Sequence, residues 1–169
     1  KSSTPSSIRE KMKELIELLM TGNENDVQIF IETFKKNFKK LPAEEISFPR
    51  SVNGIKNYSD AATLYKKGTP IHVKGAILYN MLLKKMDLEK KYPAIQDGEK
   101  LKFTYLKMPN PLKDTVISYP TKLPTEMGLD NYIDYDTQFD KAFLDPIKII
   151  LDCMGWKTEK TSSLDDFFS

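Results

Sequence analysis

The spacing of apolar residues changes twice along this chain, and this restricts the fold class more than any other feature. Apolar side chains recur at helical intervals up to residue 41, alternate with polar ones over residues 100–105, and return to helical intervals after residue 136. Long helices at both ends and one short alternating segment between them do not suit a β-sandwich or a barrel. The sequence therefore predicts an α+β fold that is mainly α-helical.

The first 41 residues predict two helices joined by a short turn. Ser2-Ser3-Thr4-Pro5 is typical of a helix start, with a hydroxyl N-cap and proline at the first helical position. Gly22 ends the first run. The apolar residues of the two runs are Ile8, Met12, Leu15, Ile16 and Leu19, then Val27, Phe30, Ile31, Phe34, Phe38 and Leu41. Two amphipathic helices so close in sequence predict an antiparallel helical hairpin.

The remaining elements are shorter. Residues 43–70 lack a clear period and contain prolines and glycines, so we expect irregular structure there. A third helix is expected over residues 74–86, and a strand over 100–105 is expected to pair with 116–119. A C-terminal helix should begin near Asp136. Its expected interruption and end are Asp145-Pro146 and Gly155.

The sequence offers no complete catalytic site. Its single cysteine, Cys153, lies far from its single histidine, His72, so neither a disulfide framework nor a Cys/His metal site is expected. Asp134 and Asp136 could together hold magnesium on a strand turn, but Asp136 precedes a helical run and is expected to cap it. We therefore expect no catalytic residue and no metal ligand. No apolar run reaches the length of a membrane span, so no membrane partner is expected either.

Charge is distributed unevenly along the chain. Residues 1–113 carry 21 lysines and arginines against 13 acids, whereas residues 114–169 carry 5 against 11. A basic body favours a polyanionic partner, because neutralised phosphates release condensed counterions. The cations comprise 24 lysines and only two arginines, Arg9 and Arg50. Since lysine lacks the planar fork that reads guanine edges, nucleic acid would be held by its backbone, with the acidic half facing away.

The last nine residues carry an unusual cluster of apolar side chains. Leu164, Phe167 and Phe168 fall on one side of a single helical turn, which would fit an apolar pocket. The pattern resembles the peptide by which replication proteins bind a sliding clamp, with Thr161 in place of the usual glutamine. The alternative is that this segment packs on its own domain.

Three further segments resemble one protein family. They are Lys1-Ser2-Ser3-Thr4-Pro5, then residues 66–75 together with Tyr79-Asn80, and finally residues 132–136 with Phe139, Lys141 and Phe143. In this order they resemble the C-terminal thumb region of family B replicative DNA polymerases from large tailed bacteriophages. The start at Lys1 rather than methionine agrees with a C-terminal part of something larger.

This resemblance implies a thumb domain over residues 1–157 and a flexible clamp-binding peptide over 158–169. The thumb of the family closes over primer–template DNA, while the catalytic carboxylates and their magnesium lie in the upstream palm and exonuclease domains. The implied partners are thus DNA, those upstream domains and the sliding clamp, in the cytoplasm of an infected bacterium. Asp134 and Asp136 lack the glycine of the family's metal-binding motif.

The resemblance also implies roles for individual residues. Lys66, Lys67, His72 and Lys74 would contact the duplex backbone. Gly68 and Gly75 would let the main chain approach phosphate. Contacts from the junction with the palm would come from Ser2, Ser3 and Thr4, while Tyr79 and Asn80 could serve either contact or packing. The clamp pocket would be filled by Leu164, Phe167 and Phe168.

Two other functions stay open at this point. The chain could be a freestanding accessory protein that binds DNA and the clamp without any polymerase partner. It could also be a magnesium-dependent enzyme that uses Asp134 and Asp136, in which case the isolated chain should be active.

Overall fold

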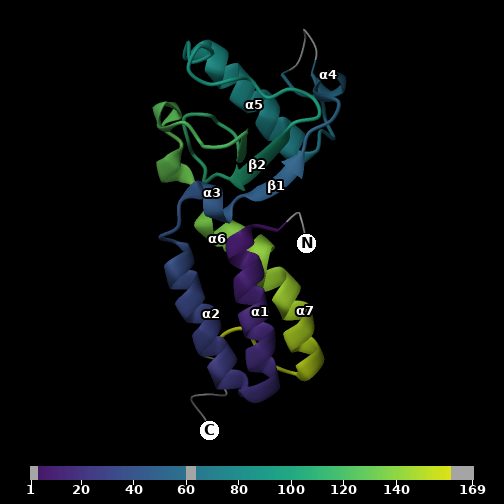
Figure 1. The fold of residues 1–169 in the computed structure, drawn as a ribbon, viewed down its shortest axis with the longest axis vertical. Helices are drawn as coiled ribbons and strands as arrows, with labels where there is room; N and C mark the ends of the chain where they lie inside the picture. Colours follow the sequence, from purple (N-terminus) through teal and green to yellow (C-terminus); the bar gives the residue numbers. More distant parts are fainter. Residues whose placement is uncertain (1–3, 60–63, 161–169) are drawn as a thin grey trace.

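A helical bundle and a small sheet with its covering helix lie end to end along the long axis of the molecule (Figure 1). The computed structural model describes residues 4–59 and 64–160. The bundle comprises α1 (Ser6–Thr21), α2 (Glu24–Phe38), α6 (Tyr135–Phe139), the π-helical turn η3 (Asp140–Leu144) and α7 (Asp145–Met154). The other part comprises β1 (Phe48–Ser51), β2 (Lys100–Tyr105), β3 (Val116–Tyr119) and α5 (Ile71–Lys85), with short helices α3 (Ala43–Ile46) and α4 (Ile55–Tyr58) and 3-10 turns η1 (Thr125–Met127) and η2 (Asp130–Tyr132). The predicted α+β class, mainly helical, is confirmed.

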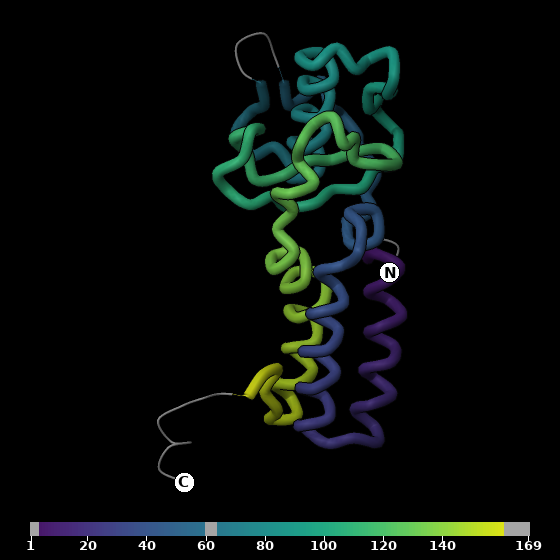
Figure 2. Tube along the Cα trace, turned by 90° about the vertical axis from the view of Figure 1, so that its left-hand side faces the viewer, coloured from purple at the N-terminus to yellow at the C-terminus, as the bar shows by residue number. Residues whose placement is uncertain are grey.

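The predicted hairpin of α1 and α2 is present, and both views show the two helices side by side (Figures 1 and 2). A reciprocal capping box starts α2: the Asp26 amide donates to Asn23 Oδ1 at 2.9 Å, and the Asn23 amide donates to Asp26 Oδ2 at 3.0 Å. The predicted start of α1 was wrong by one position. Pro5 occupies the N-cap without a side-chain hydrogen bond, so Thr4 lies outside the helix and caps nothing.

The bundle core is built around four phenylalanine rings from α2, α6 and η3. Phe34 lies edge-on to Phe38, Phe139 and Phe143, with ring centroids 4.8–5.8 Å apart. Ile8 and Leu15 from α1 are fully buried, whereas Ile16 is 50% exposed. Helical spacing placed Ile16 among the apolar residues of α1, but it could not show which part of that face has a neighbour.

The sheet has three antiparallel strands in the order β1-β2-β3. Both predicted strands are confirmed. Strand β1 falls inside residues 43–70, which were predicted to be irregular, because Pro49 in its centre is typical of a break. A strand at the sheet edge tolerates a proline whose missing donor would face outward, and β1 is such an edge strand.

Helix α5 packs along β3 through a glycine. A Cβ placed on Gly75 would lie 2.3 Å from Ser118 Oγ and 2.7 Å from the Ser118 amide nitrogen. The Ser118 hydroxyl in turn donates to the His72 carbonyl at 2.8 Å, which fixes the first turn of α5 on the strand. The helix begins at Ile71, three residues before the predicted start. It is buried on several sides, through Val73, Gly75, Ala76, Ile77, Leu78, Tyr79, Leu82 and Leu83.

The C-terminal helical run differs from expectation at its start. Asp134 is the N-cap of α6, accepting a hydrogen bond from the Thr137 amide at 3.0 Å, whereas Asp136 lies in the first turn and pairs with Lys39 at 3.1 Å. The prediction that Asp136 caps this helix was therefore wrong by two residues. The predicted interruption at Pro146 is confirmed as the π-helical turn directly before it, since a proline ring clashes with a regular preceding turn. Gly155 ends α7 at φ +73°.

The two parts of the molecule meet at Gln138, a fully buried residue of α6. Its Oε1 accepts from the Tyr105 amide of β2 at 2.9 Å, and its Nε2 donates to the Ile46 carbonyl of α3 at 2.8 Å. The Tyr135 hydroxyl adds a bond to the Leu41 carbonyl at 2.6 Å. Within the described ranges, no helix has both the length and the apolar character required to cross a membrane.

Replacing Gly75 with alanine should destabilise the fold by about 1–3 kcal/mol, because the new methyl group meets the backbone of β3. Urea unfolding would measure the loss. Ser118→Ala, which removes only the hydroxyl, is the reference. The double variant should lose less stability than the sum of the losses of the two single variants, because the missing hydroxyl makes room for the new methyl group. If the two losses simply add, position 75 and Ser118 are not in tight contact.

Candidate nucleic-acid interface

The segment before α5 forms an exposed basic turn. The Thr69 amide donates to the Lys66 carbonyl at 3.2 Å, and Gly68 has φ +86°, as expected at the third position of a type II turn. A Cβ on Gly68 would meet nothing within 4 Å, so this position needs glycine for its backbone conformation alone. Lys66 and Lys67 are both exposed, and they extend from the turn into solvent.

Behind this turn, three side chains form a latch that we define as Tyr65, Lys74 and Asp114. The Tyr65 hydroxyl donates to Asp114 Oδ2 at 2.6 Å, and Lys74 Nζ lies 2.9 Å from Asp114 Oδ1 and 4.8 Å from the Tyr65 ring centroid. The lysine and aspartate side chains are only 22% and 11% exposed. The latch therefore joins the basic turn, α5 and the loop before β3.

The electrostatics of the latch favour the ion pair. Burial opposes ionisation of Asp114, but hydrogen bonds from Tyr65 and Lys74 outweigh it and lower the pKa of the carboxyl. Burial likewise opposes the charge on Lys74, yet the bond to Asp114 leaves the lysine pKa raised. Lys74 thus faces a carboxylate within the protein. Asp114, the first acid of the acidic half, thus lies against the basic segment before α5.

His72 is the second residue of α5, and its ring lies near Phe103 of β2. The two ring centroids are 6.4 Å apart, and the Arg50 guanidinium lies 5.5 Å from the Phe103 centroid. Burial, followed by the positive charge of Arg50, lowers the pKa of His72. These surroundings favour the uncharged imidazole, which can donate or accept a hydrogen bond.

Three other predicted contact residues pack or form hydrogen bonds within the protein. Gly75 provides the close approach of α5 to β3, so its missing side chain serves packing and not an approach to phosphate. Tyr79 is 1% exposed, and burial raises its pKa to about 12, which favours the packing role of the two left open. The Asn80 side chain bonds both the amide and the carbonyl of Ile95, at 2.8 and 3.0 Å.

The structure thus brings together Lys66, Lys67, Gly68, His72 and Lys74 around the start of α5. Thr4 lies elsewhere, beside α1, where it lines a groove. The other predicted contacts, Ser2, Ser3, Leu164, Phe167 and Phe168, lie outside the described residues.

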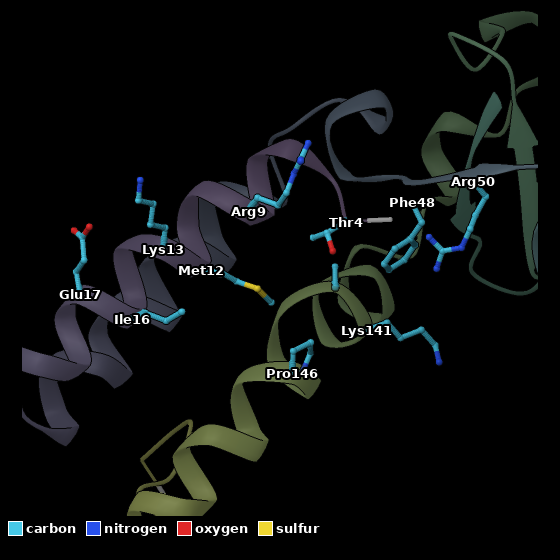
Figure 3. A pocket seen from close by; sticks show the side chains of 11 residues that line it. Thr4, Arg9, Met12, Lys13, Ile16, Glu17, Phe48, Arg50, Lys141 and Pro146 are labelled. Atoms are coloured by element: carbon cyan, nitrogen blue, oxygen red, sulfur yellow. The ribbon is translucent and has the colours of Figure 1, made fainter. Parts of the chain in front are cut away.

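That groove was not predicted from the sequence. It has a volume of about 760 Å³ and lies between α1, the η3–α7 run and β1 (Figure 3). Four cations and one carboxylate line it, together with an aliphatic floor; the charged residues are Arg9, Lys13, Arg50, Lys141 and Glu17. Both arginines of the chain line this groove. The sequence could not predict this, because Arg9 and Arg50 come together only when α1 and β1 are placed side by side.

Asp134 and Asp136 do not form a metal-binding pair. Asp134 accepts from both the amide and the hydroxyl of Thr137, while Asp136 lies beside Lys39 and Lys35. Throughout the part of the chain that the structure describes, no group of three or more acidic, histidine or cysteine side chains is arranged to hold a metal ion.

Comparison with known proteins places these observations in context. No protein-family model matches the chain. It is 30% identical over 171 residues to the DNA-directed DNA polymerase of Enterobacteria phage T4, and 29% identical over 173 residues to that of Escherichia phage RB69. The chain is similar to one segment of a phage DNA polymerase. Each match covers 99% of this chain but only 18–19% of the relative, so the chain spans less than a fifth of their length.

The predicted resemblance to phage polymerases is therefore confirmed. The similarity extends over nearly the whole chain and so includes both the basic turn and the residues that pack α5 on β3.

Asp114→Asn should weaken the latch and cost about 1–3 kcal/mol in the free energy of unfolding, because Lys74 loses the charge of a largely buried partner. Chemical denaturation measures this cost. Glu126→Gln is the matched control, since it makes the same change in the more exposed pair with Lys91. Equal losses of stability from the two substitutions would show that the latch stabilises the fold no more than an exposed ion pair does.

Proposed function

We propose that this chain is the thumb part of a DNA-directed DNA polymerase, which holds primer–template duplex by its backbone and tethers the polymerase to a sliding clamp. The observation that carries the proposal is similarity to phage DNA polymerases over 99% of the chain. The thumb assignment, membership of family B and the clamp-binding role go beyond that similarity.

Duplex holding is supported by the basic turn before α5. Lys66 and Lys67 are exposed, and Gly68 keeps the turn open to close approach. Exposed lysines bind phosphates without reading bases, which suits a protein that must follow a moving primer end. In this proposal Lys74 positions the turn through the latch, and the uncharged form of His72 can donate to or accept from a nearby group.

Catalysis would belong to the upstream part of the polymerase. The resemblance to family B polymerases implies that magnesium is held by the palm and exonuclease domains. The chain would then contribute to nucleotidyl transfer without performing it alone, inside an infected bacterium. The rival proposal, a freestanding accessory protein, would be favoured if the chain failed to restore primer extension by an upstream fragment carrying the palm.

Clamp tethering rests on Leu164, Phe167 and Phe168 in the last nine residues. A peptide that joins a polymerase to a clamp encircling DNA raises the effective concentration of polymerase at the primer end. Weak duplex binding and weak clamp binding would together give long residence.

The double substitution Lys66→Glu/Lys67→Glu should weaken binding to a primer–template duplex by about tenfold and reduce the slope of log affinity against log salt by about two. Fluorescence anisotropy over a salt series measures both quantities. Lys84→Glu/Lys85→Glu makes the same charge change at the other end of α5. An equal loss in this control would point to bulk charge and contradict a role for the turn.

Ending the chain at Lys160 should abolish binding to the cognate clamp while leaving duplex affinity within about twofold, since clamp and DNA use separate segments. Surface plasmon resonance with immobilised clamp tests this. The full-length variant Leu164→Ala/Phe167→Ala/Phe168→Ala should behave like the truncation. Persistent clamp binding by both would rule out the terminal segment as the tether.

A further inference from the structure

The groove between α1 and α7 combines an aliphatic floor with an excess of positive charge. Met12 and Ile16 of α1 face the side that carries Pro146, while Phe48 and Arg50 of β1 lie at one end (Figure 3). Its volume of about 760 Å³ is within the range of ligand-binding sites. Such a lining suits an occupant that carries both apolar side chains and negative charge.

The groove is better suited to a peptide than to nucleic acid bases. Phe48 is its one aromatic residue, and it is only 9% exposed, stacked against Phe103 with ring centroids 5.1 Å apart. The Arg50 guanidinium lies 6.0 Å from the same ring. Single-stranded nucleic acid needs accessible aromatic faces for stacking, whereas apolar peptide side chains pack well on aliphatic walls.

We propose that this groove binds the chain's own residues 161–169. That segment contains the apolar residues Leu164, Phe167 and Phe168 and the adjacent carboxylates Asp165 and Asp166. The apolar side chains would pack on the floor formed by Met12, Ile16 and Pro146, and the carboxylates would face the surrounding cations. The segment and the groove are thus complementary in both apolar character and charge.

The residues that precede this segment lie at the end of the bundle that carries the α1–α2 turn. Lys157 is held at the first turn of α2, where its amide donates to Glu24 Oε2 at 2.9 Å and its carbonyl accepts from Gln28 at 3.1 Å. This is the same end of the bundle as Thr21, and Ile16 lies only about 8 Å from that end along the axis of α1. Nine extended residues can span about 30 Å, so the segment is long enough.

A line of exposed apolar side chains leads along α1 from that end into the groove. Met20 is 82% exposed and Ile16 is 50% exposed, and both share the face of α1 that carries Met12. This strip would be partly covered by the bound segment. It therefore gives the exposed apolar residues of α1 a common role.

Binding in the groove would withhold the terminal segment from other partners. If the segment is also the clamp tether, as proposed above, clamp and groove compete for it, and the free clamp must displace the groove contacts. This consequence rests on the proposed function. The intramolecular contact itself does not require it.

The test is photo-crosslinking in the full-length chain with Phe167→p-benzoylphenylalanine, followed by mass spectrometric mapping. The expected product is a crosslink within one chain, at Met12, Ile16 or Pro146, with a yield independent of protein concentration. Arg9→Glu/Lys13→Glu should reduce that yield by about fivefold, the effect of one or two lost surface ion pairs. Lys84→Glu/Lys85→Glu, with the same charge change far from the groove, should leave it unchanged.

Several outcomes would overturn the proposal. These are crosslinks between two chains, crosslinks spread over the surface, or a yield that the groove substitutions do not alter. A short oligothymidylate could instead protect Lys13 and Lys141 of the groove from chemical modification. That result, together with no crosslink in the groove, would assign the site to nucleic acid. Because the assay contains no clamp, its failure is independent of the truncation experiment that tests the tether.

Discussion

The arrangement of the two parts of this molecule depends on one buried amide. Gln138 bonds the backbone of β2 through its oxygen and that of α3 through its nitrogen, so both of its polar atoms are satisfied in the buried joint. An apolar residue of similar size would leave the two backbone groups without these partners, at the cost of burying unpaired polar atoms. Gln138 therefore helps to fix the position of the basic turn relative to the groove.

The segment from residue 66 to residue 80 serves the surface and the interior at once. Its first residues form the exposed turn, whereas Gly75 and Tyr79 pack inside. Resemblance in such a segment does not separate residues that contact a partner from residues that hold the contacting ones in place. The latch shows the same point, because Lys74 pairs with Asp114 inside the protein.

Charge along the sequence was a partial guide to charge in space. The basic excess of residues 1–113 predicts a polyanionic partner, and Lys66 and Lys67 before α5 are exposed. The two halves are nevertheless linked by ion pairs, since Asp114 pairs with Lys74 and Asp136 with Lys39. For Lys74, which is only 22% exposed, the pairing compensates the cost of burying its charge.

Local pattern determined the helical hairpin, two of the three strands, the stop at Gly155 and the fold class, because each of these depends on residues close in sequence. Only the tertiary structure decided the rest. Edge position made Pro49 acceptable in a strand, and the approach of β3 gave Gly75 its role. The convergence of α1, β1 and η3 created a groove lined by both arginines. These features depend on which surfaces meet, and that information is not contained in any short stretch of the chain.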